Sequence, residues 1–481
     1  MKKYISDIIP YSEIQKWQKG NRILISSQTG SGKSEFIKNN LYQFAKDHNQ
    51  KILLLSNRNL LKNQNILDIG DKLDTITAQN YQELESKILN GSDVLDLFSF
   101  YDYIVYDEVH YMFSDSLFNR NTDLLLTPVK ETPQDKIFIF ITATPDALLD
   151  FQPKYDFNYT SEYDYSYIKE IVFYNRSNIA EAILQNIPYE EKAIFFSSNA
   201  QDALDLSNRF LDSSFICSAS NSLYQKADKN AMIQIAEKAM FNSRFLFSTK
   251  VLDNGVNIKD DQVKHIIIDM LDPISFIQCL GRKRILREED TITLYVKNYH
   301  GGNIYYALND IYAKIKLVDE LKQTSEETFR KKYRKKDFDN VIDNDYKINI
   351  AKYQNYITSS RLLGNMLLDK NKIGYKKYIC KQLNYKLLDI GNGDEQFEKI
   401  SIHKLLERYV GKKLFKEDQE EFKILFFDNM FSPKKTNYRH RGIRSINAIL
   451  EEDNLNFVLY SKREKDRGEF RDQNYWIIVS I

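Results

Sequence analysis

The sequence has few residues of the types that organise small secreted or metal-bound proteins. Only three of its 481 residues are cysteine, and Cys217, Cys279 and Cys380 form no C-x-x-C pair. A disulfide framework and a zinc ribbon are therefore excluded as organising principles, and a reducing, cytoplasmic environment is expected. The six histidines show no metal-ligand spacing, which gives little support to a metal-dependent nuclease.

Long apolar runs and an excess of one charge are also absent. No stretch approaches the roughly 18 apolar residues of a membrane-spanning helix, and the N-terminus lacks the features of an export signal, so we expect no membrane partner. The 68 Lys and Arg residues balance 67 Asp and Glu residues, for a formal charge of +1. Binding to nucleic acid would therefore depend on local basic patches.

Short apolar runs alternate with amphipathic stretches, a pattern typical of parallel α/β sheets. Their nearly unbroken apolar character favours strands buried on both faces. The first series of expected strands is Arg22–Ser27, Lys51–Ser56, Tyr103–Tyr106 and Ile137–Thr142. The second series is Lys192–Ser198, Phe215–Ser218, Arg244–Thr249, His265–Asp269 and Thr291–Val296. Two successive series predict two similar domains that join near Phe157–Ser166.

The segment Ser27–Ser34, SQTGSGKS, follows an expected strand and opens an expected helix. It fits the pattern G-x-x-x-x-G-K-[ST] except at its first position, where a Ser stands. Gly30 and Gly32 permit backbone conformations that turn successive N–H groups inward, so the loop can cradle phosphates. Lys33 would neutralise the β- and γ-phosphates of a nucleotide, and the Ser34 hydroxyl would bind Mg²⁺.

Two carboxylates, Asp107 and Glu108, directly follow the expected strand Tyr103–Tyr106. A carboxylate at the end of a buried strand beside the phosphate loop is suited to holding magnesium, which is the role expected of Asp107. Glu108 could accept a proton from the water that attacks the γ-phosphate. Together with the phosphate loop, the pair predicts hydrolysis of a nucleoside triphosphate.

These segments resemble the DEAD/DEAH-type superfamily 2 helicases and translocases. The phosphate loop is followed by DEVH at 107–110 and by ITATP at Ile141–Pro145. Five further segments resemble other motifs of that family in the correct order: Ser56–Gln64, Thr77–Gln82, Phe195–Leu206, Phe247–Ile258 and Gln278–Arg284. The likeness extends over roughly residues 10–300, and a bacterial, mobile-element or phage type is expected from the residue usage.

The resemblance implies an α/β fold with two tandem RecA-like parallel-sheet domains and a C-terminal α+β accessory domain. The expected boundaries are 1–160 for the ATP-binding domain, 161–304 for the second RecA-like domain and 305–481 for the accessory domain. ATP and Mg²⁺ are the implied cofactors, bound between the two RecA-like domains. A nucleic-acid strand would run across both.

The resemblance also implies the site residues. ATP would contact Ser27, Gln28, Thr29, Gly30, Ser31, Gly32, Lys33, Ser34 and Gly255. Phosphate and transition-state contacts from the second domain would come from Gln278, Arg282 and Arg284. Coupling of hydrolysis to domain closure would involve His110, Thr142 and Thr144. The nucleic-acid contacts would be Arg58, Thr77, Gln79, Ser198 and Thr249.

Two positions depart from the family pattern or leave alternatives open. Ile285 occupies the last place of Q-x-x-G-R-x-x-R, so the arginine finger is expected at Arg282 with Arg284, and Arg287 stays an alternative. The adenine base, which the family often recognises upstream of the phosphate loop, has four candidate partners: Gln15, Gln18, Tyr11 and Trp17.

Residues 305–481 match no module by motif. Arg330–Lys336 contains six basic residues in seven, and further basic residues cluster near 434–444 and 462–471, where they could contact phosphates. A solvated surface explains them equally well. An expected helix at Ser445–Leu450 and two expected strands, Asn456–Ser461 and Tyr475–Ile481, are compatible with a winged-helix-like unit. Protein partners could also bind through this region.

The sequence as a whole predicts an ATP-dependent helicase or translocase acting in replication or repair, with single-stranded DNA favoured over RNA as the partner. The alternatives are an RNA helicase, the motor subunit of a restriction or defence complex, and a protein remodeller without unwinding activity.

Overall fold

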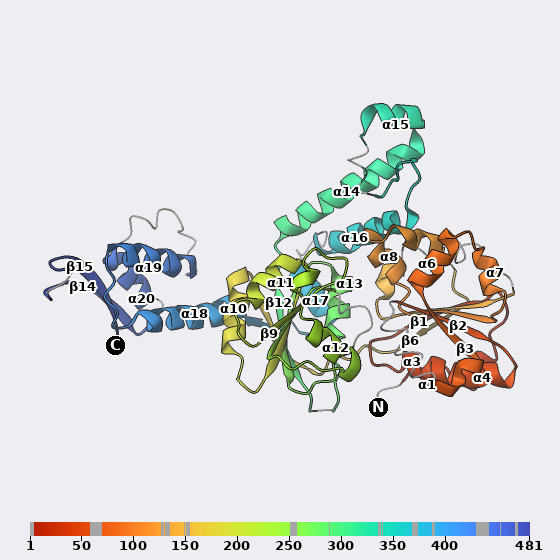
Figure 1. The fold of residues 1–481 in the computed structure, drawn as a ribbon, viewed down its shortest axis with the longest axis horizontal. Helices are drawn as coiled ribbons and strands as arrows, with labels where there is room; N and C mark the ends of the chain where they lie inside the picture. The colour runs from red at the N-terminus through yellow and green to blue at the C-terminus, as the bar shows by residue number, and fades with distance from the viewer. Residues whose placement is uncertain are drawn as a thin grey trace. The chain divides into compact units, whose positions relative to one another are not determined.

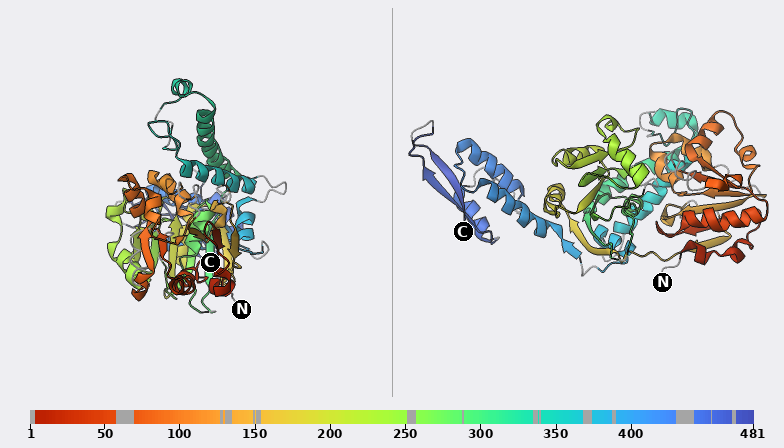
Figure 2. Two further views of the ribbon diagram at one scale, coloured as in Figure 1. Left: turned by 90° about the vertical axis from the view of Figure 1, so that its right-hand side faces the viewer. Right: turned by 60° about the horizontal axis from the view of Figure 1, so that its bottom comes forward.

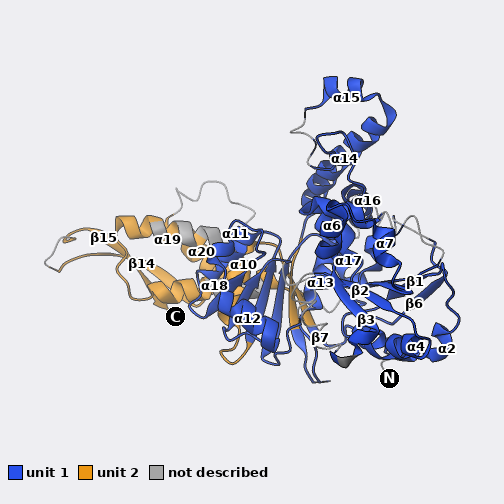
Figure 3. Ribbon diagram, turned by 45° about the vertical axis from the view of Figure 1, so that its right-hand side comes forward, with its two compact units in different colours: residues 1–169, 192–292, 299–387 blue, residues 170–191, 293–298, 388–481 orange. Residues whose placement is uncertain are grey.

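The computed structural model describes residues 4–57, 70–126, 129, 135–148, 150, 154–250, 257–287, 289–334, 338, 340–367, 374–386, 390–429, 442–452, 454–466 and 470–481 (Figure 1). The chain divides into two compact units. Unit 1 comprises residues 1–169, 192–292 and 299–387, and unit 2 comprises residues 170–191, 293–298 and 388–481 (Figure 3). Among the described residues, no helix combines the length and apolarity that crossing a bilayer requires.

The first sheet in unit 1 has six strands in the order β3-β2-β4-β5-β1-β6, and every neighbouring pair is parallel. The strands are β1 (Arg22–Ser26), β2 (Ile52–Ser56), β3 (Ile76–Asn80), β4 (Tyr103–Tyr106), β5 (Ile137–Thr142) and β6 (Phe157–Thr160). Because all six run the same way, their C-terminal ends lie along one edge of the sheet. The phosphate loop and the Asp107–Glu108 pair both follow strands that end there.

Alternate side chains of these strands enter two different hydrophobic cores. Ile139 packs with the N-terminal helices on one face, whereas Phe138 and Phe140 pack with later helices on the other. This double burial explains why the strands lack polar alternation. The helices on the first face are α1 (Ile5–Ile8), α2 (Tyr11–Ile14), α3 (Lys33–Glu35), which continues as a π-helical turn (Phe36–Leu41), and α4 (Tyr42–Asp47). Those on the second are α6 (Tyr81–Leu89), α7 (Val94–Phe98) and α8 (Tyr111–Ser114).

The second parallel sheet has seven strands. Its part in unit 1 consists of β11 (Val263–Asp269), β8 (Lys192–Ser197), β10 (Phe245–Ser248) and β9 (Ser213–Ile216), in that order. The helices between them are α11 (Ala200–Ser207), α12 (Lys229–Lys238) and α13 (Pro273–Leu280). Each begins after an Asn or Asp whose side chain accepts a backbone N–H of the first turn, which stabilises the helix start: Asn199, Asp228 and Asp272.

Four later helices also belong to unit 1. They are α14 (Gly301–Gln323), α15 (Glu326–Lys332), α16 (Ile350–Leu367) and α17 (Gly374–Gln382). Helices α14 and α15 project away from the sheets (Figure 1, Figure 2). Helix α16 returns to the first sheet, where Ala351 enters its core and Arg361 forms a 2.9 Å ion pair with Asp150.

Unit 2 contains the remaining strands and a C-terminal α+β region. Strands β13 (Ile390–Asn392), β7 (Ile168–Tyr174) and β12 (Ile292–Lys297) belong to the seven-stranded sheet. The helices are α10 (Ser177–Asn186), α18 (Gly393–Tyr409), α19 (Lys416–Asn429) and α20 (Ile443–Glu452). Strands β14 (Phe457–Arg463) and β15 (Asn474–Ser480) form an antiparallel pair, and Leu459 and Ile478 lie in the core beneath it.

The predicted fold class is confirmed: two parallel sheets with helices and a small antiparallel C-terminal sheet are present. All nine strands expected in the two series exist, within a few residues of the expected bounds. Strands β3, β6, β7 and β13 were not predicted. Three of them, β3, β6 and β13, lie at sheet edges, where half-exposed residues weaken the apolar signal. The three domain boundaries stay predictions.

The double-sided core makes the first sheet sensitive to truncation. Replacing Phe140, which is 1% exposed, by Ala should lower the free energy of unfolding by about 3–5 kcal/mol, because it removes buried ring surface and leaves a cavity. The matched control is Phe100→Ala, since Phe100 is 77% exposed and should change stability by less than about 0.5 kcal/mol. Urea unfolding followed by circular dichroism measures both, and equal losses would contradict the assignment of this core.

Candidate nucleotide-binding site

The phosphate loop connects β1 to α3 at the C-terminal edge of the first sheet. Its two glycines adopt left-handed backbone conformations, with φ of +80° at Gly30 and +83° at Gly32. Side-chain-bearing residues are strained at such angles, which explains the glycines. Ser34, the second residue of α3, is exposed and can contact a ligand. A Cβ at Gly32 would lie 3.3 Å from Cδ1 of Tyr4, so an aromatic ring that the sequence did not identify packs against the loop.

The Lys33 side chain folds back over its own loop. Its ammonium donates to the carbonyl oxygens of Ser27 at 2.6 Å and Gln28 at 3.2 Å and is buried. Burial lowers the pKa of Lys33, while the carboxylates of Glu108 and Asp107 act in the opposite direction. The cation therefore lies close to both acidic residues, as a lysine that neutralises phosphates beside a metal site should.

The acidic turn after β4 is held by backbone hydrogen bonds. Asp107 N–H donates to the Leu55 carbonyl at 2.9 Å, and Val109 N–H donates to the Ile141 carbonyl at 2.9 Å. Between them Glu108 has a φ of +52°, an uncommon conformation for a residue with a side chain. Such local strain is often found at functional sites.

The two carboxylates differ in their electrostatic surroundings. Burial and the neighbouring Glu108 raise the pKa of Asp107 to about 6, although Lys33 opposes the shift. Burial alone would also raise the pKa of Glu108, but the contact with His110 and the charge of Lys33 outweigh it and lower that pKa. His110 Nδ1 lies 3.4 Å from Glu108 Oε2, and both side chains are largely buried. Glu108 is therefore ionised and can accept a proton.

A chain of hydrogen bonds joins the two parallel sheets. The Arg282 guanidinium is buried and donates to Gln278 O at 3.0 Å and Gln278 Oε1 at 2.7 Å. The Gln278 amide donates to Thr144 Oγ1 at 3.2 Å, and Thr144 N–H donates to Thr142 Oγ1 at 3.0 Å. Arg282 and the expected coupling residues Thr142 and Thr144 are thus connected through Gln278.

The three candidate finger arginines occupy different environments. The Arg284 Nη1 lies 3.2 Å from a Cβ built at Gly30, and its Nε donates to Asn257 Oδ1 at 2.6 Å. Burial lowers the pKa of Arg284 to about 10, with a further contribution from Arg282, so it remains charged at neutral pH. Arg287 is exposed and pairs with Asp261 at 2.7 Å. The structure therefore places Arg282 and Arg284, and not Arg287, at the phosphate loop.

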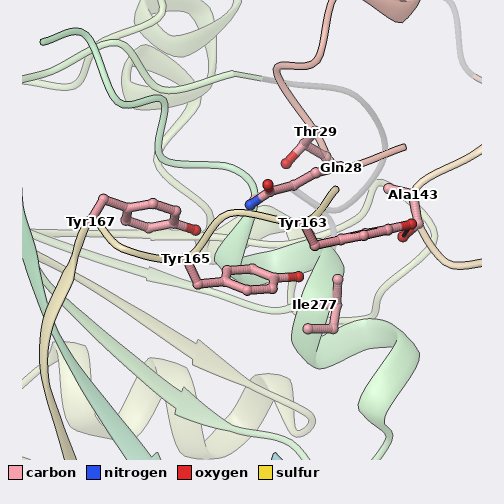
Figure 4. A pocket seen from close by; sticks show the side chains of 8 residues that line it. Gln28, Thr29, Ala143, Tyr163, Tyr165, Tyr167 and Ile277 are labelled. Atoms are coloured by element: carbon pink, nitrogen blue, oxygen red, sulfur yellow. Dashed lines mark hydrogen bonds between the residues drawn. The ribbon is translucent and has the colours of Figure 1, made fainter. Parts of the chain in front are cut away.

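The segment after β6 crosses the phosphate loop. The Gln28 side-chain amide donates to the Asp164 carbonyl and accepts from the Asp164 N–H, each at 2.8 Å. Tyr163, Tyr165 and Tyr167 line a pocket there together with Gln28, Thr29, Ala143, Ile277 and Gly281 (Figure 4). The sequence analysis missed these tyrosines, although the alternation Y-x-Y-x-Y indicates one face of an extended segment.

Gly281 approaches the phosphate loop from the second sheet. A Cβ at this position would lie 2.4 Å from Thr29 Oγ1 and 3.0 Å from Thr29 Cγ2, which real side chains do not permit. The glycine that precedes Arg282 is therefore required by close packing and not by backbone conformation.

The candidate adenine partners differ in burial. Trp17 is buried, its Nε1 donates to the Tyr159 hydroxyl at 3.2 Å, and its ring packs on Phe36, so it is a core residue. Tyr11 packs on Phe44. Gln15 and Gln18 are exposed.

Four of the five expected nucleic-acid residues lie on a strand or directly after one. Thr77 and Gln79 belong to β3, Ser198 follows β8 and Thr249 follows β10. Gln79 is buried, and its Nε2 has no hydrogen-bond partner among the described residues. Arg58 and Gly255 lie outside the described residues.

The basic segment at 330–336 is partly neutralised. Within α15 and its end, Arg330 pairs with Glu326, Lys331 with Glu327 and Lys332 with Glu320. Most residues of the basic cluster at 434–444 lie outside the described residues. Acidic partners therefore reduce the positive charge of the expected basic patch at 330–336. The number of basic residues in the sequence does not include these partners.

The hydrogen-bond chain between the sheets generates a stability prediction. Thr144→Val keeps the side-chain shape but leaves the buried Gln278 amide without its acceptor, so the free energy of unfolding should fall by about 1–3 kcal/mol. Thr160→Val is the matched control, because Thr160 is exposed at the end of β6. Urea unfolding compares the two variants. If Thr144→Val leaves the free energy of unfolding unchanged, this contact contributes little to stability.

Part of the chain resembles a known protein family. Residues 11–151 match the family model described as DEAD/DEAH box helicase. No curated protein matches the chain. Among solved structures, a variant of S. cerevisiae Dbp5 bound to RNA and ADP BeF3 shares 14% identity with a TM-score of 0.43, covering 72% of this chain and 89% of that one. Mss116p with its NTE and C-tail deleted, bound to ssRNA and AMP-PNP, shares 14% identity with a TM-score of 0.44, covering 74% and 90%.

The family match spans the phosphate loop and the acidic turn, and the two parallel sheets supply the fold that such a site requires. Residues 11–151 of this chain therefore resemble a DEAD/DEAH box helicase domain, and the match includes both the phosphate loop and the acidic turn.

Proposed function

We propose that this protein uses ATP hydrolysis to move along, and to separate, strands of nucleic acid. The observation that supports this most directly is the meeting of Lys33, Asp107 and Glu108 with Arg282 and Arg284, which come from different sheets. Hydrolysis would change the negative charge of the bound phosphates, which residues from both sheets would contact. The parts of the protein that carry the two sheets can then open and close with each cycle of ATP binding and hydrolysis.

Nucleotide binding is assigned to the loop from Ser27 to Ser34. The backbone N–H groups of the loop and of the start of α3 would hold the phosphates, and Lys33 would exchange its loop carbonyl partners for phosphate oxygens. The Ser34 hydroxyl and the Asp107 carboxylate are hard oxygen donors, which fits a magnesium ion. Bound there, the ion would neutralise charge on the β- and γ-phosphates.

Glu108 is assigned as the general base. Its lowered pKa keeps it ionised, and the turn fixed by Asp107 and Val109 N–H groups directs it at the site. Arg282 and Arg284 would stabilise the charge that develops on the transferred phosphoryl group. A movement of Arg282 would be transmitted to the first sheet through Gln278, Thr144 and Thr142. His110 would act directly on Glu108, which it contacts.

The strand is proposed to lie along the C-terminal edges of the two sheets, near Gln79, Ser198 and Thr249. Ligands of parallel α/β sheets bind at these edges. Contacts to phosphates do not distinguish DNA from RNA. The preference for single-stranded DNA that the sequence suggested is therefore tested directly against RNA.

The first test is steady-state ATP hydrolysis without nucleic acid and with single-stranded DNA, duplex DNA or RNA. We expect low basal activity, strong stimulation by a single strand, and a loss of at least about 100-fold in Lys33→Ala, because the phosphate charge is no longer neutralised. Lys154→Ala is the control, since Lys154 is exposed. A Lys33-dependent rate that no nucleic acid changes would contradict a strand motor and favour a protein remodeller.

A second test separates the arginines. Arg282→Ala and Arg284→Ala should each lower kcat by about 10³-fold, since removal of a transition-state cation costs several kcal/mol. Arg287→Ala should stay within about twofold of wild type, because Arg287 pairs with Asp261 at the surface. ATPase kinetics with matched thermal unfolding of each variant distinguish lost chemistry from lost folding. A large loss in Arg287→Ala alone would overturn the assignment.

A further inference from the structure

We propose that Tyr111 and Glu85 are positioning residues that couple the nucleic-acid edge of β2 and β3 to the catalytic turn at Asp107–Glu108. The inference rests on the proposed function, because it concerns how strand binding stimulates hydrolysis. It is carried by a buried polar cluster on the second face of the first sheet. The cluster is made of Asn57, Gln82, Glu85, Tyr111 and Asn119.

The cluster reaches the catalytic turn through Tyr81. The Tyr81 hydroxyl donates to the Asp107 carbonyl at 2.8 Å, and its ring stacks on that of Tyr111 with centroids 4.9 Å apart and planes 7° from parallel. The Asp107 carbonyl belongs to the peptide that precedes Glu108. A shift of Tyr81 therefore changes the orientation of the peptide on which the unusual φ of Glu108 depends.

The Tyr111 hydroxyl is the centre of the cluster. It accepts from the Gln82 amide at 2.9 Å and the Asn119 amide at 3.2 Å, and it lies 3.5 Å from Glu85 Oε1 as a donor. Asn119 also donates to Glu85 Oε2 at 2.8 Å. Two accepted bonds and one donated contact use the full capacity of a phenol oxygen. The Tyr111 hydroxyl therefore joins Gln82, Asn119 and Glu85 at one point.

The other end of the cluster lies where strand contacts are proposed. The Gln82 amide also donates to Asn57 Oδ1 at 3.3 Å, and Asn57 directly follows β2. Helix α6, which carries Gln82 and Glu85, follows β3 without a gap and is capped by Asn80. Ser56 Oγ and Gln79 Nε2 are buried at this edge without a hydrogen-bond partner among the described residues. A buried polar atom without a partner requires an explanation, and a strand bound at this edge would supply one.

Glu85 takes up a proton more readily than an exposed carboxyl group does. It is 3% exposed, and burial raises its pKa to about 7, with a contribution from the charge of Asp115 and opposition from its bonds to Asn119 and Tyr111. Among the described residues, no cation contributes to this shift. A Gln side chain keeps the shape and one of the two acceptor oxygens, whereas removal of the side chain should release both Asn119 and Tyr111.

The experiment compares the full-length variants Tyr111→Phe, Glu85→Ala and Glu85→Gln with wild type, using ATPase assays with and without oligo(dT) or oligo(U). Tyr111→Phe keeps the stacked ring and removes only the hydroxyl. We expect it and Glu85→Ala to keep basal activity and the KM for ATP within about twofold while the stimulated kcat falls about tenfold. Glu85→Gln, which keeps one of the two acceptor oxygens, should recover part of the stimulation. Lys87→Gln, at an exposed position of the same helix, is the control.

The outcomes separate this inference from the function on which it rests. If Tyr111→Phe and Glu85→Ala together lose no more than the larger single effect, both act in one connection, which supports the proposal. If Tyr111→Phe lowers basal and stimulated rates equally, or changes neither, the coupling is overturned. Should Glu85→Ala fail to fold, Tyr111→Phe decides alone. A wild-type protein that neither polymer stimulates would overturn the proposed function, and the coupling with it.

Discussion

The site depends on a balance of buried charges around Lys33. Three cations, Lys33, Arg282 and Arg284, lie among two carboxylates, Asp107 and Glu108, in surroundings that burial makes unfavourable for isolated charges. Each cation is held by hydrogen bonds to neutral acceptors as well as by opposite charge. The surplus of positive charge suits a polyanionic ligand, and the carboxylates suit a metal and a proton acceptor.

The parallel sheets explain how these groups come together. Ser27, Asp107 and Thr142 lie far apart in the chain, but each lies at the C-terminal end of a strand of one sheet. The second sheet contributes Gln278 and Arg282 by way of α13. Two further segments reach the phosphate loop. Gly281 packs against Thr29, and the backbone of Asp164 forms two hydrogen bonds with the Gln28 side chain. The pocket of three tyrosines arises from the same crossing.

Much of this site could be predicted from the sequence because its signals are local. A glycine-rich turn between a strand and a helix, and two carboxylates directly after a buried strand, are readable within a few residues. The sequence could not show in that way whether Trp17, Arg287 and the basic residues from Arg330 contact a ligand. Whether an aromatic ring is buried, or a cation is paired with an acid several residues away, depends on packing that residue counts do not contain.

The sequence by itself determined the two α/β series, the phosphate loop and the acidic pair, because apolar runs and glycine positions express the backbone requirements of those elements directly. The tertiary structure alone decided which arginines reach the loop, that Tyr4 and the pocket tyrosines Tyr163, Tyr165 and Tyr167 lie beside it, and that the Tyr111 hydroxyl contacts Glu85. These are contacts between segments distant in the chain. Their geometry is set by the packing of whole elements, which a single sequence does not specify residue by residue.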